Sequence, residues 1–517
     1  MYTCSQINYK EVFNVINSKI AMYFLGIDLG SSSIKLAVLD GHSGKALANT
    51  TVPEKEMQMH APKAGWAEQD PELWWNYICD GIKKLRSDGV AIARIQAIGI
   101  SYQMHGLVLT DKNLKVLRPS IIWCDSRAAP IGSQIYTEKG ASFFQERVLQ
   151  SPGNFTASKL KWVQKNEPEL FKKVAHMMLP GDYIAAKFSG VAQTSKSGLS
   201  EAALWNFKKQ SLATEVLEAM ELPKDVIPEI VANFGIQAQI DSTLAEELGL
   251  SKEVKITYRA GDQPNNALSL NVTQPGEIAT TAGTSAVIYS VTDQDASDTE
   301  NRVNTFLHVN HTEKQKRNGV LLCINGSGIL YQWLRKILST EQNQLISYDQ
   351  LNKLASQVAP GSDGLLFYPF GNGVERIFNN KKSSSGIENL NFNRHETAHV
   401  VRAACEGIVF AMNYGFEVMQ TIGAGGSRVK ATHANLFLSP VFRDIFVNTT
   451  QTSLELYNTN GAEGAARGAA FGFGHYSSLN EANQSLELMG TQEPDPRLTQ
   501  AYKAYYQNWK NNIQIRD

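Results

Sequence analysis

Two stretches of the chain, 253 residues apart, repeat one order of apolar and polar positions. Each has an apolar strand, a turn made of Gly, a hydroxyl residue and Ser, and a second apolar strand. The first covers residues 24–39 and the second 276–291, so that the turn Gly30–Ser32 aligns with the turn Gly283–Ser285. Glycine permits a tight turn, and successive N–H groups in such a turn form a concave anion site. One turn alone is typical of an ordinary hairpin, whereas the repeat favours two turns that hold a polyphosphate between them.

Further along the chain, apolar runs alternate with amphipathic segments. Asp70 and Pro71 predict the start of a helix, because Asp is a favoured N-cap and Pro suits the first helical position. The sequence also predicts buried strands at 95–101, 121–123 and 255–260, a long helix at 396–422, and a helix of small residues after Asn460. Strands that alternate with helices indicate α/β domains, in which ligands collect beyond the carboxyl ends of the strands.

The length of 517 residues is too great for one hydrophobic core, so two large domains are expected. The apolar pattern begins near Met22, and residues 1–21 are predicted to be an N-terminal extension whose role cannot be read. The second hairpin divides the remainder into residues 22–268 and residues 269–517. The sequence shows no low-complexity linker, and we therefore expect two domains that pack together around a cleft.

Composition narrows the classes of function. Apolar residues make up 43% of the chain and charged residues 19%, as in ordinary globular proteins. The net charge of −1 gives no electrostatic reason to expect nucleic acid or an anionic membrane as a partner. The five cysteines are scattered and form no CxxC pair, so a reducing cytoplasm fits better than a zinc site or a disulfide framework. No apolar stretch reaches the ~18 residues of a membrane span, and the polar N-terminus does not read as a signal peptide.

Two aspartates carry the predicted chemistry. Phosphoryl transfer to a hydroxyl needs a base, a metal ion, donors for the phosphates and a pocket for the acceptor. Asp262 is the predicted base, since it follows a strand and stands next to Gly261, which would leave room for substrate. Taken alone, an Asp shortly before Pro264 is more often a helix N-cap. Asp28 stands two residues before Gly30, and a carboxylate beside phosphates implies Mg²⁺ between them, held through water.

Polar residues also follow the predicted strands at 95–101 and 121–123. Gln103 and His105 are candidates to hydrogen-bond sugar hydroxyls, although a single His in a loop is more often structural. For Asp125 and Arg127 a local ion pair is the favoured interpretation.

With these residues in place, the chain resembles the FGGY carbohydrate kinases and, among them, the xylulokinases. The similarity runs from about Phe24 to the C-terminal region. It rests on Gly26–Ser32, Glu68–Glu72, Gln103–Gly106, Trp123 with Asp125 and Arg127, Gly261–Asp262, Gly283–Ser285, Asn154–Trp162, Leu179–Tyr183 and, more weakly, Val374–Arg376. As a set, these motifs are highly specific for the family.

The resemblance implies an α/β fold of two ribonuclease-H-like domains, as in actin and hexokinase, which close over ATP and a sugar in an interdomain cleft. It implies that Asp262 is the general base for the 5-hydroxyl of a pentulose and that Asp28 lies next to the metal ion. The sugar site is expected to contain Gln103, Met104, His105 and Gln263, and the phosphates are expected near Gly30, Ser31, Ser32, Gly283, Thr284 and Ser285. The Gln-Met-His-Gly motif indicates D-xylulose rather than glycerol as the acceptor.

The chain departs from the family pattern at three places. Gln263 follows the predicted base where the family usually has Asn, a change expected to affect sugar selection. The Gly-rich adenine loop is replaced by Ala431–Asn435, so no adenine contact is assigned there. The segment Ser195–Glu201 has lost acidic character. Together these departures indicate a divergent branch.

The sequence thus predicts a cytoplasmic sugar kinase, dependent on ATP and Mg²⁺, that converts D-xylulose to D-xylulose 5-phosphate. A kinase of the same family for another ketose or a polyol is the nearest alternative. A non-catalytic relative that binds sugar or nucleotide is favoured only by the altered adenine loop. Asp28, Asp262 and both turns argue against it, because a binding protein needs no base. The sequence leaves the oligomeric state open, a homodimer included.

Overall fold

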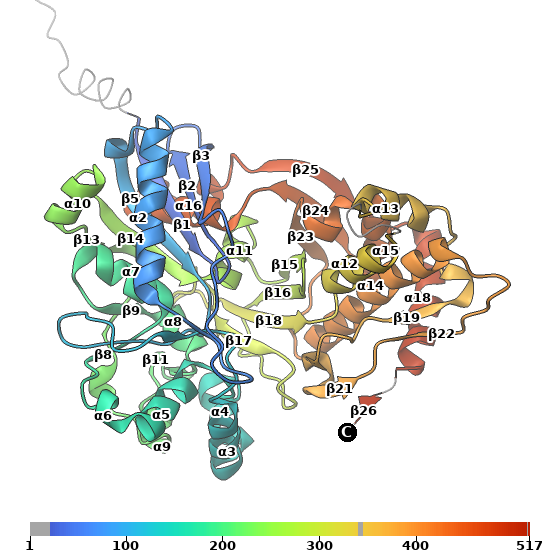
Figure 1. The fold of residues 1–517 in the computed structure, drawn as a ribbon, viewed down its shortest axis with the longest axis horizontal. Helices are drawn as coiled ribbons and strands as arrows, with labels where there is room; N and C mark the ends of the chain where they lie inside the picture. Colours follow the sequence, from blue (N-terminus) through green and yellow to red (C-terminus); the bar gives the residue numbers. More distant parts are fainter. Residues whose placement is uncertain (1–20, 340–344, 514, 517) are drawn as a thin grey trace, which may run out of the picture.

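Two mixed β-sheets, one from each half of the chain, form the framework of the protein. The computed structural model describes residues 21–339, 345–513 and 515–516. The predicted extension, residues 1–21, lies outside these ranges except for its last residue. Figure 1 shows the first sheet, in blue and green, on the left of the molecule, and the second sheet between it and the orange helices on the right.

The first sheet has six strands. In spatial order they are β13 (Phe234–Gln239), β14 (Lys255–Gly261), β5 (Ile95–Tyr102), β1 (Tyr23–Leu29), β2 (Ile34–Asp40) and β3 (Ala46–Val52). Strands β1, β5 and β14 are parallel to one another. At one edge β13 is antiparallel to β14, and at the other edge β2 is antiparallel to β1 and β3 is antiparallel to β2.

The second sheet has seven strands and repeats the first. In spatial order they are β17 (Asn304–Leu307), β18 (Asn318–Ile324), β16 (Ala286–Thr292), β15 (Glu277–Ala282), β23 (Arg428–Thr432), β24 (Ser453–Asn458) and β25 (Glu487–Gln492). The six strands from β18 to β25 pair in the same sequence of directions as the six strands of the first sheet taken from β3 to β13. In both, two antiparallel pairs are followed by two parallel pairs and a last antiparallel pair. The repeated hairpin of the sequence therefore belongs to a repeated domain, and the predicted pair of ribonuclease-H-like α/β domains is confirmed.

Helices cover both faces of the first sheet. On one face, α2 (Pro71–Ser87) and α7 (Pro180–Ser189) bury the side chains of Leu25 and Ile27. On the other face lies α16 (Gly461–Phe473), a helix from the far end of the chain. Successive residues of β1 thus alternate between two helix layers.

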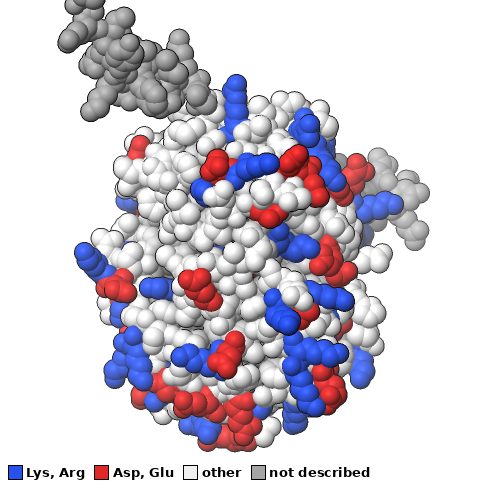
Figure 2. Space-filling view, turned by 90° about the vertical axis from the view of Figure 1, so that its left-hand side faces the viewer, with Lys and Arg blue, Asp and Glu red and all other residues white. Residues whose placement is uncertain are grey.

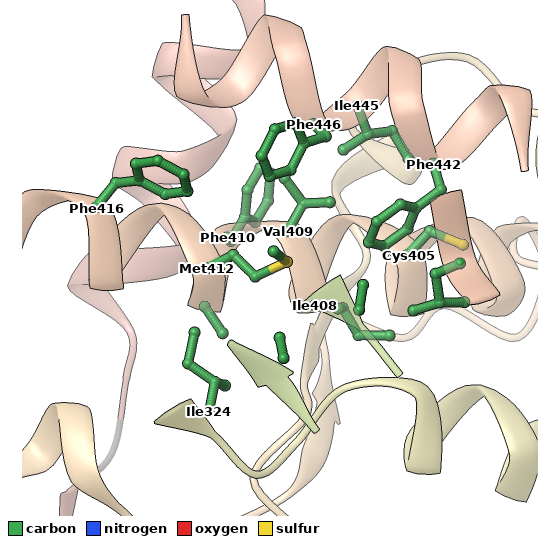
Figure 3. Close-up of a cluster of buried hydrophobic side chains, with 14 of the residues drawn as sticks. Ile324, Cys405, Ile408, Val409, Phe410, Met412, Phe416, Phe442, Ile445 and Phe446 are labelled. Atoms are coloured by element: carbon green, nitrogen blue, oxygen red, sulfur yellow. The ribbon is translucent and has the colours of Figure 1, made fainter. Parts of the chain in front are cut away.

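The second sheet is covered in the same way. Helices α14 (Thr397–Thr421) and α15 (Pro440–Thr450) pack on one face, and α11 (Asp262–Ser269) packs on the other. Figure 3 shows Ile408 and Met412 of α14 between Phe442 of α15 and Ile324 of the sheet. Helices α11 and α16 also contact each other, so both lie between the two sheets.

Shorter elements complete both halves. In the first half they are β4 (Glu68–Gln69), β6 (Val108–Thr110), β7 (Ser120–Ile121), α3 (Ala129–Lys139), α4 (Ala141–Val148), α5 (Thr156–Asn166), α6 (Pro168–Phe171), β8 (His176–Met178), β9 (Gln193–Ser195), α8 (Lys196–Glu201), β10 (Trp205–Asn206), β11 (Ser211–Leu212), α9 (Thr214–Ala219), β12 (Glu229–Val231) and α10 (Ser242–Leu248). In the second half they are α12 (Gly328–Ile337), α13 (Tyr348–Ser356), β19 (Leu366–Tyr368), β20 (Val374–Glu375), β21 (Lys381–Ser383), β22 (Gly386–Glu388), α17 (Leu479–Ala482), α18 (Pro496–Asn511) and β26 (Ile515–Arg516). Within the described ranges, no helix has the length and apolar character needed to cross a membrane.

Most elements predicted from the pattern are confirmed. Helix α2 begins at Pro71, and Oδ1 of Asp70 accepts a hydrogen bond from the N–H of Glu72 (2.9 Å). Helix α14 matches the prediction at 396–422 within a residue at each end. The predicted strand at 121–123 is wrong in its extent, because the N–H of Asp125 donates to the carbonyl oxygen of Ile122 and so closes a turn there.

Candidate active site

The first turn, Gly30–Ser32, joins β1 to β2; the N–H of Gly30 donates to the carbonyl oxygens of Asp28 and Ser33 (3.2 and 3.1 Å) and so closes the turn. Nε2 of Gln69 donates to the carbonyl oxygen of Ser31 (2.7 Å), and Nε1 of Trp123 donates to its hydroxyl oxygen (3.3 Å). The N–H groups of Ser31 and Ser32 have no acceptor among the described residues. These contacts hold the turn by its carbonyl side and leave N–H groups available to an anion.

The second turn, Gly283–Ser285, joins β15 to β16 and has the same property. The N–H groups of Gly328 and Ile329, at the start of α12, donate to the carbonyl oxygens of Gly283 and Thr284 (2.8 and 3.1 Å). In the part of the chain that the structure describes, the N–H and hydroxyl groups of this turn have no acceptor or donor of their own. Both repeated turns therefore fit the predicted role of phosphate cradles.

A cavity of about 310 Å³ lies between the two sheets. Asp28 and Lys35 line it from the first sheet and Thr281 from the second, while Gln263 and Gly461 line it from the helices between the sheets. The wall includes residues shortly before each turn but not the turns themselves, which lie beside it. This cavity between the halves is the place where a ligand can touch both repeats.

Asp28 is held at the wall of this cavity by two neighbours. Oγ of Ser101 donates to Oδ1 of Asp28 (2.7 Å). Its Oδ2 lies so close to Gly461 that a Cβ at that position would be only 2.4 Å away, so the start of α16 must be glycine. Burial raises the pKa of Asp28, while the hydrogen bond from Ser101 and the charge of Lys35 act in the opposite direction.

The residues around Asp28 fit a magnesium ion bound together with phosphates. Among the residues that the structure describes, no group of three or more His, Cys, Asp or Glu side chains could hold a metal ion by itself. A cation at Asp28 would take one carboxylate from the protein and its other oxygens from phosphate and water. Mg²⁺ is commonly bound in this way, because it gives up its water ligands reluctantly.

Asp262 is the first residue of α11, directly after β14. The helix begins two residues before Pro264, and Gly261 rather than Asp262 occupies the N-cap position. Burial, and after it the charge of Asp28, raises the pKa of Asp262 to about 7. Nε2 of Gln263 donates to Oδ2 of Asp262 (3.3 Å). A carboxyl with this pKa is suited to accept a proton near neutral pH.

Met104 and His105 lie next to this aspartate. The side chain of Met104 packs against Gly261, where a Cβ would lie 2.5 Å from its Cγ. His105 has a left-handed backbone (φ 61°), and its ring centroid is 4.6 Å from that of Phe155 and 5.5 Å from that of Phe306. Burial lowers the pKa of His105 to about 3, so its imidazole is neutral at physiological pH. A neutral imidazole both donates and accepts hydrogen bonds, as recognition of a hydroxyl requires.

Gln103 has a different set of contacts from its neighbours. Its side chain is 2% exposed, and its Nε2 donates to Oε1 of Gln69 (3.1 Å), the residue that binds the carbonyl oxygen of Ser31. The structure therefore connects Gln103 to the first turn, and its contact with a sugar stays a prediction.

Comparisons with known proteins agree with this arrangement. Residues 23–269 match the N-terminal domain of the FGGY family of carbohydrate kinases, and residues 278–472 match its C-terminal domain. The xylulose kinase of Bacillus subtilis is 31% identical over 504 residues, which make up 95% of this chain and 96% of that protein. The chain belongs to the FGGY family of carbohydrate kinases. It is a sugar kinase, and ATP is one of its two substrates.

Other FGGY kinases show how far the fold itself is informative. The xylulose kinase of Escherichia coli is 28% identical, over 93% of this chain and 96% of that one. The crystal structure of xylulose kinase from Rhodospirillum rubrum has a TM-score of 0.84 at 22% identity and covers 95% of this chain and 98% of that chain. The glycerol kinase of Plasmodium falciparum with ADP has a TM-score of 0.85 at 17% identity, with 96% and 99% covered. Since the two scores are alike, the acceptor must be argued from the site.

Lys35 is a candidate of the FGGY site that the sequence analysis missed. In the β1–β2 hairpin it is the cross-strand partner of Asp28, and it lines the same cavity. An ammonium group at this position offsets the negative charge of phosphates. The sequence could have indicated Lys35, because residues at equal distance from a hairpin turn lie opposite each other, and Lys35 is therefore opposite Asp28.

The replaced adenine loop lies at the second turn of the kinase. Strand β23 ends at Thr432, and Asn435 lines the cavity with a left-handed backbone (φ 55°). A Cβ at Gly283 would lie 3.5 Å from Nδ2 of Asn435. The segment thus borders the phosphate side of the cavity, and we assign it no adenine contact.

The predicted ion pair of Asp125 and Arg127 is confirmed. Nη2 of Arg127 lies 2.6 Å from Oδ2 of Asp125, and its Nη1 lies 2.7 Å from Oε1 of Glu68. The guanidinium group stacks on the ring of Trp66, 3.7 Å from its centroid. All of these groups are buried or partly buried, which indicates a structural network.

Proposed function

We propose that this kinase transfers the terminal phosphoryl group of ATP to the 5-hydroxyl of D-xylulose. One observation carries the proposal: Asp262, whose pKa is about 7, directly precedes Gln263 in the wall of the cavity between the sheets, and both repeated turns beside this cavity have free N–H groups. The motif Gln103–Gly106 and the xylulose kinases among its relatives support this acceptor.

In this reaction Asp262 accepts the proton of the sugar hydroxyl while the hydroxyl oxygen attacks the terminal phosphorus atom of ATP. The bond from this phosphorus to the bridging oxygen breaks, and ADP leaves. The N–H groups of Ser31 and Ser32 and those of Gly283–Ser285 stabilise negative charge on the phosphates. Lys35 adds a positive charge on the same side of the cavity. Asp28 would hold a Mg²⁺ ion through water, and this ion would supply further positive charge to the phosphates.

The sugar side of the proposed reaction is formed by Met104 and His105. Nε2 of His105 has no hydrogen-bond partner within the described ranges, so it is available to a sugar hydroxyl. Gln263 lines the cavity next to the base and adds an amide group to the same site.

We also propose a cytoplasmic enzyme without a nucleic-acid or membrane partner. On the face drawn in Figure 2, Lys and Arg side chains lie among Asp and Glu side chains. Cys79, Cys124, Cys323 and Cys405 carry free thiols, as expected in a reducing compartment. A homodimer stays a prediction.

The test of the acceptor is a panel of sugars. Purified enzyme with Mg²⁺ and ATP is expected to turn over D-xylulose faster than D-ribulose, L-xylulose, gluconate or glycerol, since the Met104–His105 site is that of the xylulokinase motif. The measurement is ADP release in a coupled assay. Preference for another compound of the panel assigns the alternative acceptor. No turnover with any of the five contradicts the proposal and favours a binding protein.

The pH dependence follows from Asp262. Because the base must be ionised, kcat/KM for the sugar is expected to rise about tenfold per pH unit below its pKa and to level off above it. The bend is expected near pH 7, where the pKa of Asp262 lies (about 7). The measurement is a profile from about pH 5.5 to 8.5 with excess coupling enzymes. A flat profile over this range would contradict the assignment.

A further inference from the structure

Glu201 is a buried carboxyl at the sugar side that the proposed reaction does not use. It is the last residue of α8, and only 1% of it is exposed. Among the described residues, no Lys, Arg or His forms an ion pair with it. A carboxyl buried without a cationic partner is costly, so its presence calls for a reason.

The backbone of His105 is fixed through this residue. The N–H of His105 donates to Oε1 of Glu201 (3.3 Å). From the other side, Nζ of Lys159 donates to the carbonyl oxygen of His105 (2.8 Å). The left-handed conformation of His105 is costly for a residue with a Cβ, and persists only where the surroundings hold it. Glu201 and Lys159 provide that hold.

The ring of His105 is oriented by the same residue. Its Nδ1 lies 3.1 Å from the carbonyl oxygen of Glu201. Since a carbonyl oxygen only accepts, Nδ1 carries the proton, and Nε2 of the neutral ring is left as an acceptor. The main chain at Glu201 thus determines which nitrogen of His105 can bind a sugar hydroxyl, and this contact does not depend on the side chain at position 201.

The second carboxyl oxygen of Glu201 reaches the start of α11. A Cβ at Gly261 would lie 2.5 Å from this Oε2. Gly261 is therefore needed for the contact with Glu201 and Met104, and not only to leave room for substrate. Burial, and with it the negative charge of Asp262, holds the pKa of Glu201 well above its usual range.

We infer that Glu201 is a positioning residue that fixes His105 and the Gly261–Asp262 junction in the geometry that binds the sugar. The inference rests on the proposed function, because it places His105 at the acceptor. It also assigns a role to the segment Ser195–Glu201, which has less acidic character than the family pattern. The one acidic residue of this segment, Glu201, is the residue that contacts His105.

Two substitutions separate this role from simple packing. Glu201→Leu removes the acceptor for the N–H of His105, and we expect KM for the sugar to rise about 10- to 100-fold, as for a buried donor left unpaired. KM for ATP should stay within about twofold, because the phosphate turns make no contact with Glu201. Glu201→Gln has nearly the same shape and keeps a side-chain oxygen that can accept from the N–H of His105. We expect its sugar KM to lie within about threefold of wild type.

The matched control is Ile408→Val in the core of the second domain (Figure 3), a buried site remote from His105. It should lower the melting temperature without changing either KM. Amide hydrogen exchange of the segment Gln103–Gly106 provides a readout without substrate. Exchange at His105 should be faster in Glu201→Leu and unchanged in Glu201→Gln and Ile408→Val.

The outcomes distinguish the inference from the proposed function. A wild-type enzyme that is inactive on the whole panel overturns the proposed function, and the exchange experiment still decides whether Glu201 holds His105. An active enzyme whose Glu201→Leu variant folds, keeps its sugar KM and shows wild-type exchange overturns the inference. Equal impairment of both variants overturns the role as a hydrogen-bond acceptor.

Discussion

Asp262→Asn is expected to lower kcat about 10²- to 10⁴-fold, the loss that follows removal of a general base. Asparagine has nearly the same shape and keeps the side-chain oxygen that accepts from Nε2 of Gln263, so KM for the sugar should change little. The measurement is steady-state turnover of Mg²⁺-ATP and D-xylulose. Asp80→Asn, on the exposed side of α2, is the control and should leave kcat unchanged.

The same variant should be more stable than wild type above neutral pH. Burial raises the pKa of Asp262 to about 7, whereas the unfolded chain has the ordinary value of about 4. Between these values the folded state binds more protons, so the contribution of Asp262 to stability is fully present below the unfolded pKa and is lost as pH rises through the folded pKa. The neutral amide of Asp262→Asn carries no such cost, and the melting temperature of the variant near pH 8 should exceed that of wild type.

Two results would contradict the assignment of the base. Turnover above about one tenth of wild type in Asp262→Asn would mean that another group accepts the proton. A melting temperature that is lower than wild type near pH 8 would mean that the carboxylate is stabilised rather than strained by its surroundings. Inactivity combined with higher stability identifies Asp262 as a residue kept for chemistry and not for folding.

Local features of the chain predicted much of this site. The strand–turn–strand repeat requires only neighbouring residues, and it located both turns and, through Asp28, one wall of the cavity. The N-cap at Asp70 and the long helix α14 are likewise determined by their own residues. Asp262 could be named because it follows β14 directly, although its pKa depends on the burial and on Asp28, which only the folded chain supplies.

Contacts between distant segments could not be predicted in the same way. Glu201 and His105 are 96 residues apart, and the sequence contains no pattern that pairs them. The helix of small residues after Asn460 could be predicted, but its place on the first sheet could not, because that sheet is formed by residues 200 or more positions away. The glycines of this helix indicate that another element packs closely against it, but they do not identify that element.

The close packing of α16 on the first sheet leads to the second large effect, that of Gly26→Ala. A Cβ at Gly26 would lie 1.9 Å from the carbonyl oxygen of Ala462 and 2.4 Å from the backbone nitrogen of Ala466. Both are backbone atoms of α16, so no side chain can rotate away, and the helix itself must move. Overpacking of this kind costs about 3 kcal/mol, and the melting temperature should fall by on the order of 5 °C.

The control for this prediction is Gly386→Ala in β22, where no atom lies within 4 Å of the added Cβ and the melting temperature should not fall. Displacement of α16 should also lower catalytic activity, because Gly461 at the start of this helix lies against the carboxylate of Asp28. We therefore expect Gly26→Ala to lose kcat at temperatures where it is still folded. Wild-type melting and turnover in Gly26→Ala would mean that α16 does not seat on β1 as described. A lower melting temperature with full activity would mean that the helix supports the fold without positioning Asp28.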